Sequence, residues 1–270
     1  SPQDVGWRAA AANLSDLAAS GVTEPVGLTV GLVAPAQTPW TWVEGVYEGL
    51  NAALTTHGGC LLGGDCTEGR QRTLAITALG QCGPLRLHRN QARPGDWLVV
   101  SGPHGLSRLG LALLQNTLDP TREQLDPALC QEAIRQHQRP QPRFDGLQSL
   151  LGCKPDGLEW RAGGTDSSDG LLTAVRDLCR SSHCGALLDR AALPLAKGWP
   201  QTEPWQTWCL NGGEDFELVL SLPPTWARRW LARQPGSQRI GEINDASGQI
   251  LWSDGSGAVS AAAGYAHFSA

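Results

Sequence analysis

A strand, a glycine-bearing turn and a helix follow one another repeatedly along this chain, and that order constrains its fold more than any other feature. Residues 95–116 (GDWLVVSGPHGLSRLGLALLQN) and 163–179 (GGTDSSDGLLTAVRDLC) both show it. Residues 216–234 join the strand-like FELVLSLP to the helix-like PTWARRWLARQ, and two short strand-like segments, QRIGEI and GQILWS, follow. These patterns predict an α/β domain in the later part of the chain.

The first part of the chain has a different pattern, with longer helices. It predicts one alanine-rich helix over 4–20, a second over 41–57, a strand from 60 that ends at Gly63-Gly64-Asp65, and a strand over 73–80. We place a domain boundary near residue 88, which divides the chain into 1–88 and 89–270. The predicted fold class is α+β with two domains.

Composition excludes several classes of protein. A net charge of −5 argues against a sequence-independent nucleic-acid binder, and no apolar run is long enough to span a membrane. The start of the chain has no signal-peptide pattern, so we expect a cytoplasmic protein. The eight cysteines form no C-x-x-C pair, which disfavours zinc ribbons and redox motifs. Neither lysine follows a G-x-x-x-x-G pattern, which excludes a P-loop.

Four aspartates stand beside small residues in turn-like segments. They are Asp16 in NLSD, Asp65 in GGDC, and Asp166 and Asp169 in DSSDG. Each one alone is most simply a helix N-cap. Together they suit Mg²⁺, which is held by few carboxylates together with substrate phosphates. Glycines beside such carboxylates let phosphates approach the backbone closely. The sequence therefore predicts that all four converge on one metal and phosphate site.

Six segments occur in an order and at a spacing that resemble the thiamine-phosphate kinase family: NLSDLAASG, LLGGDCTEG, RNQARPGDWLVVSG, DSSDGL, NGGEDFEL and GYAHF. This family belongs to the superfamily of aminoimidazole ribonucleotide synthetase. The resemblance implies a mixed-sheet N-terminal domain that forms a homodimer, followed by a C-terminal α/β domain. It also implies in-line transfer of the γ-phosphoryl group of ATP to thiamine phosphate, with Mg²⁺.

The resemblance also implies residue roles where positions match. The magnesium ligands are Asp16, Asp65, Asp166 and Asp169. The ATP contacts are Tyr47, Gly64, Asp65, Arg89 and Ser168. The thiamine phosphate contacts are Glu214 and Tyr265. We assign no catalytic base, because the acceptor phosphate is already an anion.

Two further observations, one on composition and one on the family pattern, lead to expectations about the start of the chain and its activity. The chain has no methionine, and it lacks the G-D-D-A and S-T-D-x-x-V-E-G-x-H-F motifs with which the family begins. We therefore expect that residue 1 is not the natural start, and that the chain as given binds ATP weakly and transfers phosphate poorly. Two alternatives stay open: a superfamily enzyme with another acceptor, and a non-catalytic ATP-binding remnant.

Overall fold

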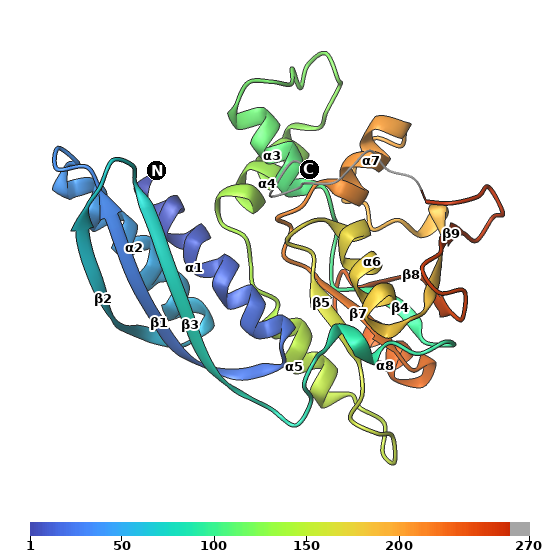
Figure 1. Cartoon of the computed structure of the whole chain (residues 1–270). Coiled ribbons are helices and arrows are strands. Elements are labelled where there is room, and N and C mark those ends of the chain that lie inside the picture. The colour runs from blue at the N-terminus through green and yellow to red at the C-terminus, as the bar shows by residue number, and fades with distance from the viewer. Residues whose placement is uncertain (260–270) are drawn as a thin grey trace.

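The computed structural model describes residues 1–259 and has two lobes, each built around a sheet (Figure 1). The first sheet has the strand order β2-β1-β3. Strand β1 (Val22–Ala34) is parallel to β2 (Cys60–Glu68) and antiparallel to β3 (Thr73–Cys82). The helices of this lobe are α1 (Pro2–Ala19) and α2 (Trp40–His57). The predicted α+β class with two domains is confirmed.

Helices α1 and α2 lie in backbone contact because glycines stand where they cross. A Cβ atom added to Gly6 would lie 1.9 Å from a backbone oxygen of α2, and one added to Gly49 would lie 2.0 Å from a backbone oxygen of α1. Leu14, Leu28 and Leu50 are fully buried where these helices pack on the sheet. The helices cover one face only, and most residues of β2 and β3 stay exposed.

The second lobe contains a mixed six-stranded sheet with the order β5-β7-β4-β8-β6-β9. Its neighbouring strands are antiparallel, except for the parallel pair β6 and β9. The strands are β4 (Trp97–Val100), β5 (Gly163–Asp166), β6 (Gly185–Leu188), β7 (Leu218–Leu222), β8 (Gln238–Asn244) and β9 (Ile250–Trp252). The helices are α3 (Leu106–Leu114), α4 (Pro127–Gln138), α5 (Phe144–Gly152), α6 (Leu171–Ser182), α7 (Glu203–Asn211) and α8 (Pro224–Arg233), with 3₁₀ turns at Arg89–Gln91 and Arg190–Ala192.

Both faces of the second sheet are covered by helices. Successive side chains of a strand point to opposite faces, and β4 shows this alternation: Leu98 and Val100 join the core with α6 and α7, whereas Val99 joins the core with α5 and α8. The continuous apolar run WLVV in the sequence is thus explained by burial on two sides.

The glycines of β2 have a different role from the predicted one. The sequence suggested that the strand ends at Gly63-Gly64-Asp65, but β2 continues to Glu68. A Cβ atom at Gly64 would lie 1.9 Å from the carbonyl oxygen of Val30 in β1, so this glycine permits close strand contact and does not form a turn. Asp65 consequently lies within a strand, where it pairs with Gly31.

The passage from one lobe to the other lies between β3 and β4. The first sheet ends at Cys82 and the second begins at Trp97, so the boundary predicted near residue 88 falls in the connecting segment. Leu85 and Leu87 already pack into the core of the second lobe. The boundary itself stays a prediction.

A buried ion pair ties the start of β4 to the segment before β5. The guanidinium of Arg161 donates to both carboxylate oxygens of Asp96, at 2.6 and 2.9 Å. The Asp96 carboxylate also accepts a hydrogen bond of 2.8 Å from the Ser221 hydroxyl and one of 3.0 Å from the Arg93 amide. Both charged side chains are at most 7% exposed. Because the pair is bidentate and further hydrogen-bonded, it holds three segments of the sheet together.

Candidate functional site

Helix α1 packs against strand β5 (Figure 1), and three of the four predicted aspartates lie at this contact. Asp16 lies near the end of α1, Asp166 is the last residue of β5, and Asp169 stands in the turn before α6. The charges of Asp166 and Asp169 both act on Asp16, and so does the charge of Arg89. The Ser15 hydroxyl joins the two lobes directly by donating a 2.6 Å hydrogen bond to Asp166. We call Asp16, Asp166 and Asp169 the carboxylate cluster.

Asp166 is held in place by two hydroxyl groups. Ser15 donates to its Oδ2 atom at 2.6 Å and Ser168 donates to its Oδ1 atom at 3.1 Å. The residue is 6% exposed. A carboxylate has about four acceptor positions, so these two bonds orient the group and leave acceptor capacity for a cation.

Arg89 lies beside the cluster in the 3₁₀ turn that leads into the second lobe. Its Nε atom donates to the Thr165 hydroxyl at 3.1 Å, and one terminal nitrogen lies 3.5 Å from Asp177. The side chain is 54% exposed. The guanidinium is therefore tethered at its base while its head remains accessible, an arrangement suited to phosphate oxygens.

The cluster carries excess negative charge. The pKa of Asp16 is raised to about 6, first by burial and then by the charge of Asp166, with a further contribution from Asp169, whereas Arg89 acts in the opposite direction. Within residues 1–259, no three acidic, histidine or cysteine side chains are placed to bind an ion by themselves. The arrangement fits a hydrated Mg²⁺ shared with phosphate oxygens better than an ion enclosed by protein ligands.

Tyr47, Gly64 and Asp65 form a second group, on α2 and β2. They line one pocket of about 390 Å³, and the Tyr47 hydroxyl lies 3.9 Å from the Cys66 sulfur. In the described part of the chain, no hydrogen bond, ion pair or electrostatic interaction joins Asp65 to the carboxylate cluster. The predicted convergence of four aspartates is thus observed for three, and the role of Asp65 as a metal ligand stays a prediction.

Glu214 lies in the loop between α7 and β7. Its amide donates a 2.7 Å hydrogen bond to the carbonyl oxygen of Ser168, in the turn that carries Asp169. Its carboxylate forms an ion pair with Arg8 of α1. The predicted acceptor-binding residue therefore stands next to the carboxylate cluster. Tyr265, the other predicted acceptor contact, lies outside the described residues.

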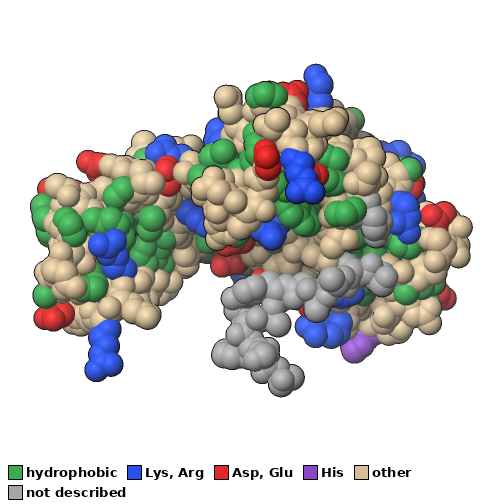
Figure 2. Space-filling model, turned by 90° about the horizontal axis from the view of Figure 1, so that it is seen from above, with side chains coloured by type: hydrophobic (Ala, Val, Ile, Leu, Met, Phe, Trp, Pro, Cys, Tyr) green, Lys and Arg blue, Asp and Glu red, His purple; other side chains and the backbone are tan. Residues whose placement is uncertain are grey.

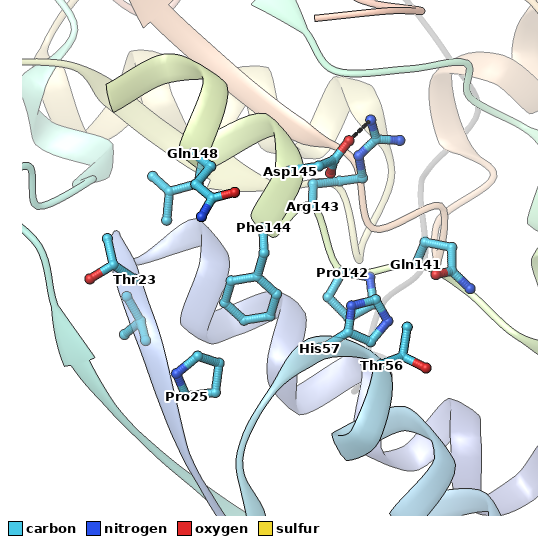
Figure 3. Close-up of a pocket in the computed structure, with 12 residues that line it drawn as sticks. Thr23, Pro25, Thr56, His57, Gln141, Pro142, Arg143, Phe144, Asp145 and Gln148 are labelled. Carbon is cyan, nitrogen blue, oxygen red and sulfur yellow. Dashed lines mark hydrogen bonds and ion pairs between the residues drawn. The ribbon is translucent and has the colours of Figure 1, made fainter. Parts of the chain in front are cut away.

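A separate cavity of about 530 Å³ lies between the two lobes, at the start of β1, the end of α2 and the start of α5 (Figure 3). Phe144 and His57 stand over it, and Arg143 is paired with Asp145 at its edge. None of the residues predicted for the site lines this cavity. The site is therefore defined by the carboxylate cluster and not by this interlobe cavity.

Comparison with known proteins places the chain in a family. Residues 1–82 match the family model "AIR synthase related protein, N-terminal domain", and residues 93–253 match "AIR synthase related protein, C-terminal domain". A thiamine-monophosphate kinase of Prochlorococcus marinus is 56% identical over 94% of this chain and 76% of the relative. The chain belongs to the thiamine-monophosphate kinase family. The resemblance seen in the sequence motifs is confirmed.

Further relatives of this family agree. A thiamine-monophosphate kinase of Synechococcus elongatus is 42% identical, and the match covers 99% of this chain and 80% of the relative. A solved structure, AaThiL complexed with AMPPCP and TMP, superposes with a TM-score of 0.82 at 26% identity and covers 99% of this chain and 81% of that chain. Members of the kinase family thus resemble this chain both in sequence and in the two-lobed fold.

The sequence motifs missed three residues that contact the candidate site. Ser15 directly precedes Asp16 in NLSD and Thr165 precedes Asp166, so their positions in the motifs were a usable signal. Arg8 carried no local signal, because it lies far from Glu214 in sequence and meets it only through the packing of α1 against the second lobe.

Proposed function

We propose that this chain transfers the γ-phosphoryl group of ATP to thiamine phosphate and so forms thiamine diphosphate. The observation that carries the proposal is the carboxylate cluster, in which aspartates from the two lobes meet beside the accessible guanidinium of Arg89. Independent helix caps have no reason to converge, whereas a site for a cation and polyphosphate requires it. Family membership supports the same reaction.

Each site residue has a proposed role in binding the metal, ATP or the acceptor. Asp16, Asp166 and Asp169 would hold Mg²⁺, which when bound neutralises the charge of the phosphates. Arg89 and Ser168 would contact ATP. Tyr47, Gly64 and Asp65, which line the pocket on α2 and β2, are assigned the same role by the family resemblance alone. Glu214 and Tyr265 would contact the thiamine part of the acceptor. No side chain is needed as a base, because the attacking phosphate oxygen is already ionised, so the work of the protein is alignment and charge compensation.

The test is to measure thiamine diphosphate formation from ATP and thiamine phosphate, with Mg²⁺ and after its removal by a chelator. We expect Mg²⁺-dependent product, and none with thiamine or another phosphate monoester as acceptor. Faster turnover of a different acceptor would favour another superfamily enzyme. A folded chain that binds ATP without turnover would favour the non-catalytic remnant.

Binding of Mg²⁺ should depend on pH through Asp16. Because the pKa of Asp16 is raised to about 6, its carboxylate is increasingly protonated below that pH and must lose a proton to bind a cation. We expect the Mg²⁺ concentration for half-maximal activity to rise as pH falls from 7 to 5, by about tenfold per pH unit at the low end. An Asp16→Asn variant should lose most of this pH dependence. An unchanged profile in the variant would exclude Asp16 as the titrating group.

The Asp16→Asn variant should also change the stability of the folded chain. A carboxyl whose pKa is raised by folding contributes stability below its unfolded value of 3.8 and loses that contribution as pH rises through about 6. At pH 7, Asp16→Asn should therefore stabilise the chain without Mg²⁺. The gain should be at most about 1 kcal/mol, because the Asp16 side chain is partly open to solvent, which screens the repulsion.

We also propose a homodimer formed through the open face of the first sheet. Val26, Leu62 and Leu79 are 41%, 44% and 48% exposed, and hydrophobic side chains gather on this lobe in Figure 2. An uncovered apolar sheet face is a typical interface for a second copy. Light scattering should give twice the chain mass, and Leu62→Lys with Leu79→Lys should give the monomer mass. A wild-type monomer at micromolar concentration would contradict this proposal.

A cytoplasmic location is part of the proposal. All eight cysteines are free in the structure, which suits a reducing compartment. No helix among residues 1–259 has the length and apolarity to cross a bilayer. Recovery of the protein mainly in the membrane fraction after cell lysis would count against this location.

A further inference from the structure

Arg8 of α1 reaches across to the second lobe and meets two groups there. Its guanidinium forms an ion pair with Oε2 of Glu214. Another nitrogen of the same guanidinium donates to the carbonyl oxygen of His137 at the end of α4 and lies 3.3 Å from the Nδ1 atom of His137. The Arg8 side chain is only 24% exposed, whereas that of Glu214 is 48% exposed. Arg8 is thus held in place by its contacts, whereas the Glu214 side chain is accessible to solvent.

The contacts of Arg8 continue into a closed ring of polar groups. The Ser107 hydroxyl lies 3.0 Å from Nδ1 of His137, and the Ser107 amide donates to Asp215 at 2.9 Å. The Gly105 amide donates to the other oxygen of Asp215 at 2.7 Å. Asp215 is 1% exposed and is the next residue after Glu214. The backbone on one side of Glu214 is therefore anchored to the first turn of α3.

The backbone around Glu214 is strained in the way that functional loops often are. Glu214 and Phe216 have φ values of +58° and +55°, a left-handed conformation that non-glycine residues seldom adopt. The Glu214 amide is held by Ser168 at 2.7 Å, and the Asp215 carboxylate by the amides of α3. These hydrogen bonds thus fix the backbone position of Glu214. The ion pair with Arg8 then fixes the orientation of its side chain.

We propose that Arg8 is a positioning residue for acceptor binding: it holds Oε2 of Glu214 and presents Oε1 to a hydrogen-bond donor of the acceptor. This inference rests on the proposed function, in which the acceptor carries the amino group of thiamine. In the described part of the chain, Oε1 of Glu214 has no hydrogen-bond partner. A carboxylate with one oxygen fixed by an arginine offers the other oxygen at a defined angle.

The structure provides a matched control on the same helix. Asp4 of α1 forms an ion pair of 2.6 Å with Arg139, which follows α4. This pair also joins the two lobes but contacts none of the site residues. Asp4 is 18% and Arg139 is 46% exposed, so the pair is partly buried like the Arg8 pair, with the arginine as its more exposed member. Loss of the Arg139–Asp4 pair therefore shows how an interlobe ion pair outside the site affects substrate affinity and kinetics.

The experiment compares Arg8→Gln, Arg8→Lys, Arg139→Gln, Glu214→Gln and the Arg8→Gln/Glu214→Gln double variant. Thiamine phosphate affinity is measured by calorimetry, and KM and kcat are measured for both substrates. We expect Arg8→Gln to weaken thiamine phosphate binding and raise its KM about tenfold or more, while the KM for ATP changes less than about twofold. Arg8→Lys should recover part of the loss because it keeps the charge without the fork. Arg139→Gln should change neither KM.

The double variant tests whether Arg8 acts through Glu214. We expect its affinity for thiamine phosphate to equal that of Glu214→Gln alone, because the effects of two residues in one unit do not multiply. Multiplicative losses, or an Arg8→Gln variant that melts earlier with wild-type KM, would overturn the inference. If Arg8→Gln fails to fold, Arg8→Lys alone decides, since wild-type affinity in that variant together with a retained fold would also overturn it.

Failure of the proposed function can be told apart from failure of this inference. A wild-type chain that binds thiamine phosphate but forms no product contradicts the kinase proposal, while calorimetry on the variants still decides the role of Arg8. A wild-type chain that forms product while Arg8→Gln keeps its affinity contradicts only the role of Arg8. A wild-type chain that does not bind thiamine phosphate overturns both.

Discussion

Replacing Asp166 by asparagine is expected to lower the rate of phosphoryl transfer about 100-fold or more while the fold is retained. Asp166 is the buried member of the carboxylate cluster and is oriented by Ser15 and Ser168. Asparagine keeps its shape but removes the charge that would hold Mg²⁺ against the phosphates. Steady-state kinetics at saturating ATP and thiamine phosphate, with a Mg²⁺ titration, measures the loss.

The expected change in stability has the opposite sign from the change in rate. Asp166 raises the pKa of Asp16 through its charge, so its neutralisation relieves repulsion in the metal-free site. The melting temperature without Mg²⁺ should stay the same or rise. Asp156→Asn, in an exposed turn after α5, is the matched control and should change neither quantity. Near wild-type kinetics for Asp166→Asn would refute the assignment of the cluster as the site.

Replacing Arg161 by methionine is expected to lower the free energy of unfolding by about 3 to 5 kcal/mol. The change leaves Asp96 buried with a charge that only Ser221 and the Arg93 amide then satisfy. For a chain of this size, the loss corresponds to a fall in melting temperature of roughly 10 °C. Urea denaturation followed by tryptophan fluorescence gives the free energy directly.

Arg180→Met is the control for the loss of Arg161. Arg180 pairs with Asp177 at 2.8 Å, but its side chain is 81% exposed, so the same substitution there should cost less than about 1 kcal/mol. Adding Asp96→Ala to Arg161→Met should recover part of the loss, because no unpaired buried charge remains. Equal losses of unfolding free energy for Arg161→Met and Arg180→Met would show that burial does not determine how much the Arg161–Asp96 pair contributes to stability.

Much of the fold could be predicted from local pattern. The helix expected over 4–20 is α1, the helix expected over 41–57 is α2, and the strand and helix expected over 95–116 are β4 and α3. Hydrophobic periodicity and the glycines that end an element are local features of the chain, so they can be read directly from the sequence. The strand predicted to end at Asp65 continues to Glu68 instead, because the need for glycine came from contact with Val30 on a neighbouring strand.

The candidate site divides in the same way. The motifs identified Asp16, Asp166 and Asp169 as chemically suited to a cation, and family membership supports that choice. Only the packing of α1 on β5 decided that they share one site, while Asp65 lies in a separate pocket of the same chain. Spacing along a sequence does not determine distance across a lobe boundary.

Local sequence pattern thus identified the helices, the strands and the motifs that carry charge. Tertiary structure alone decided the ring that links Arg8, His137 and Asp215 around Glu214. It also decided the strained backbone that presents Glu214. The physical reason is that such contacts join residues far apart in the chain, where electrostatics and hydrogen bonding depend on distances that only the packed lobes define.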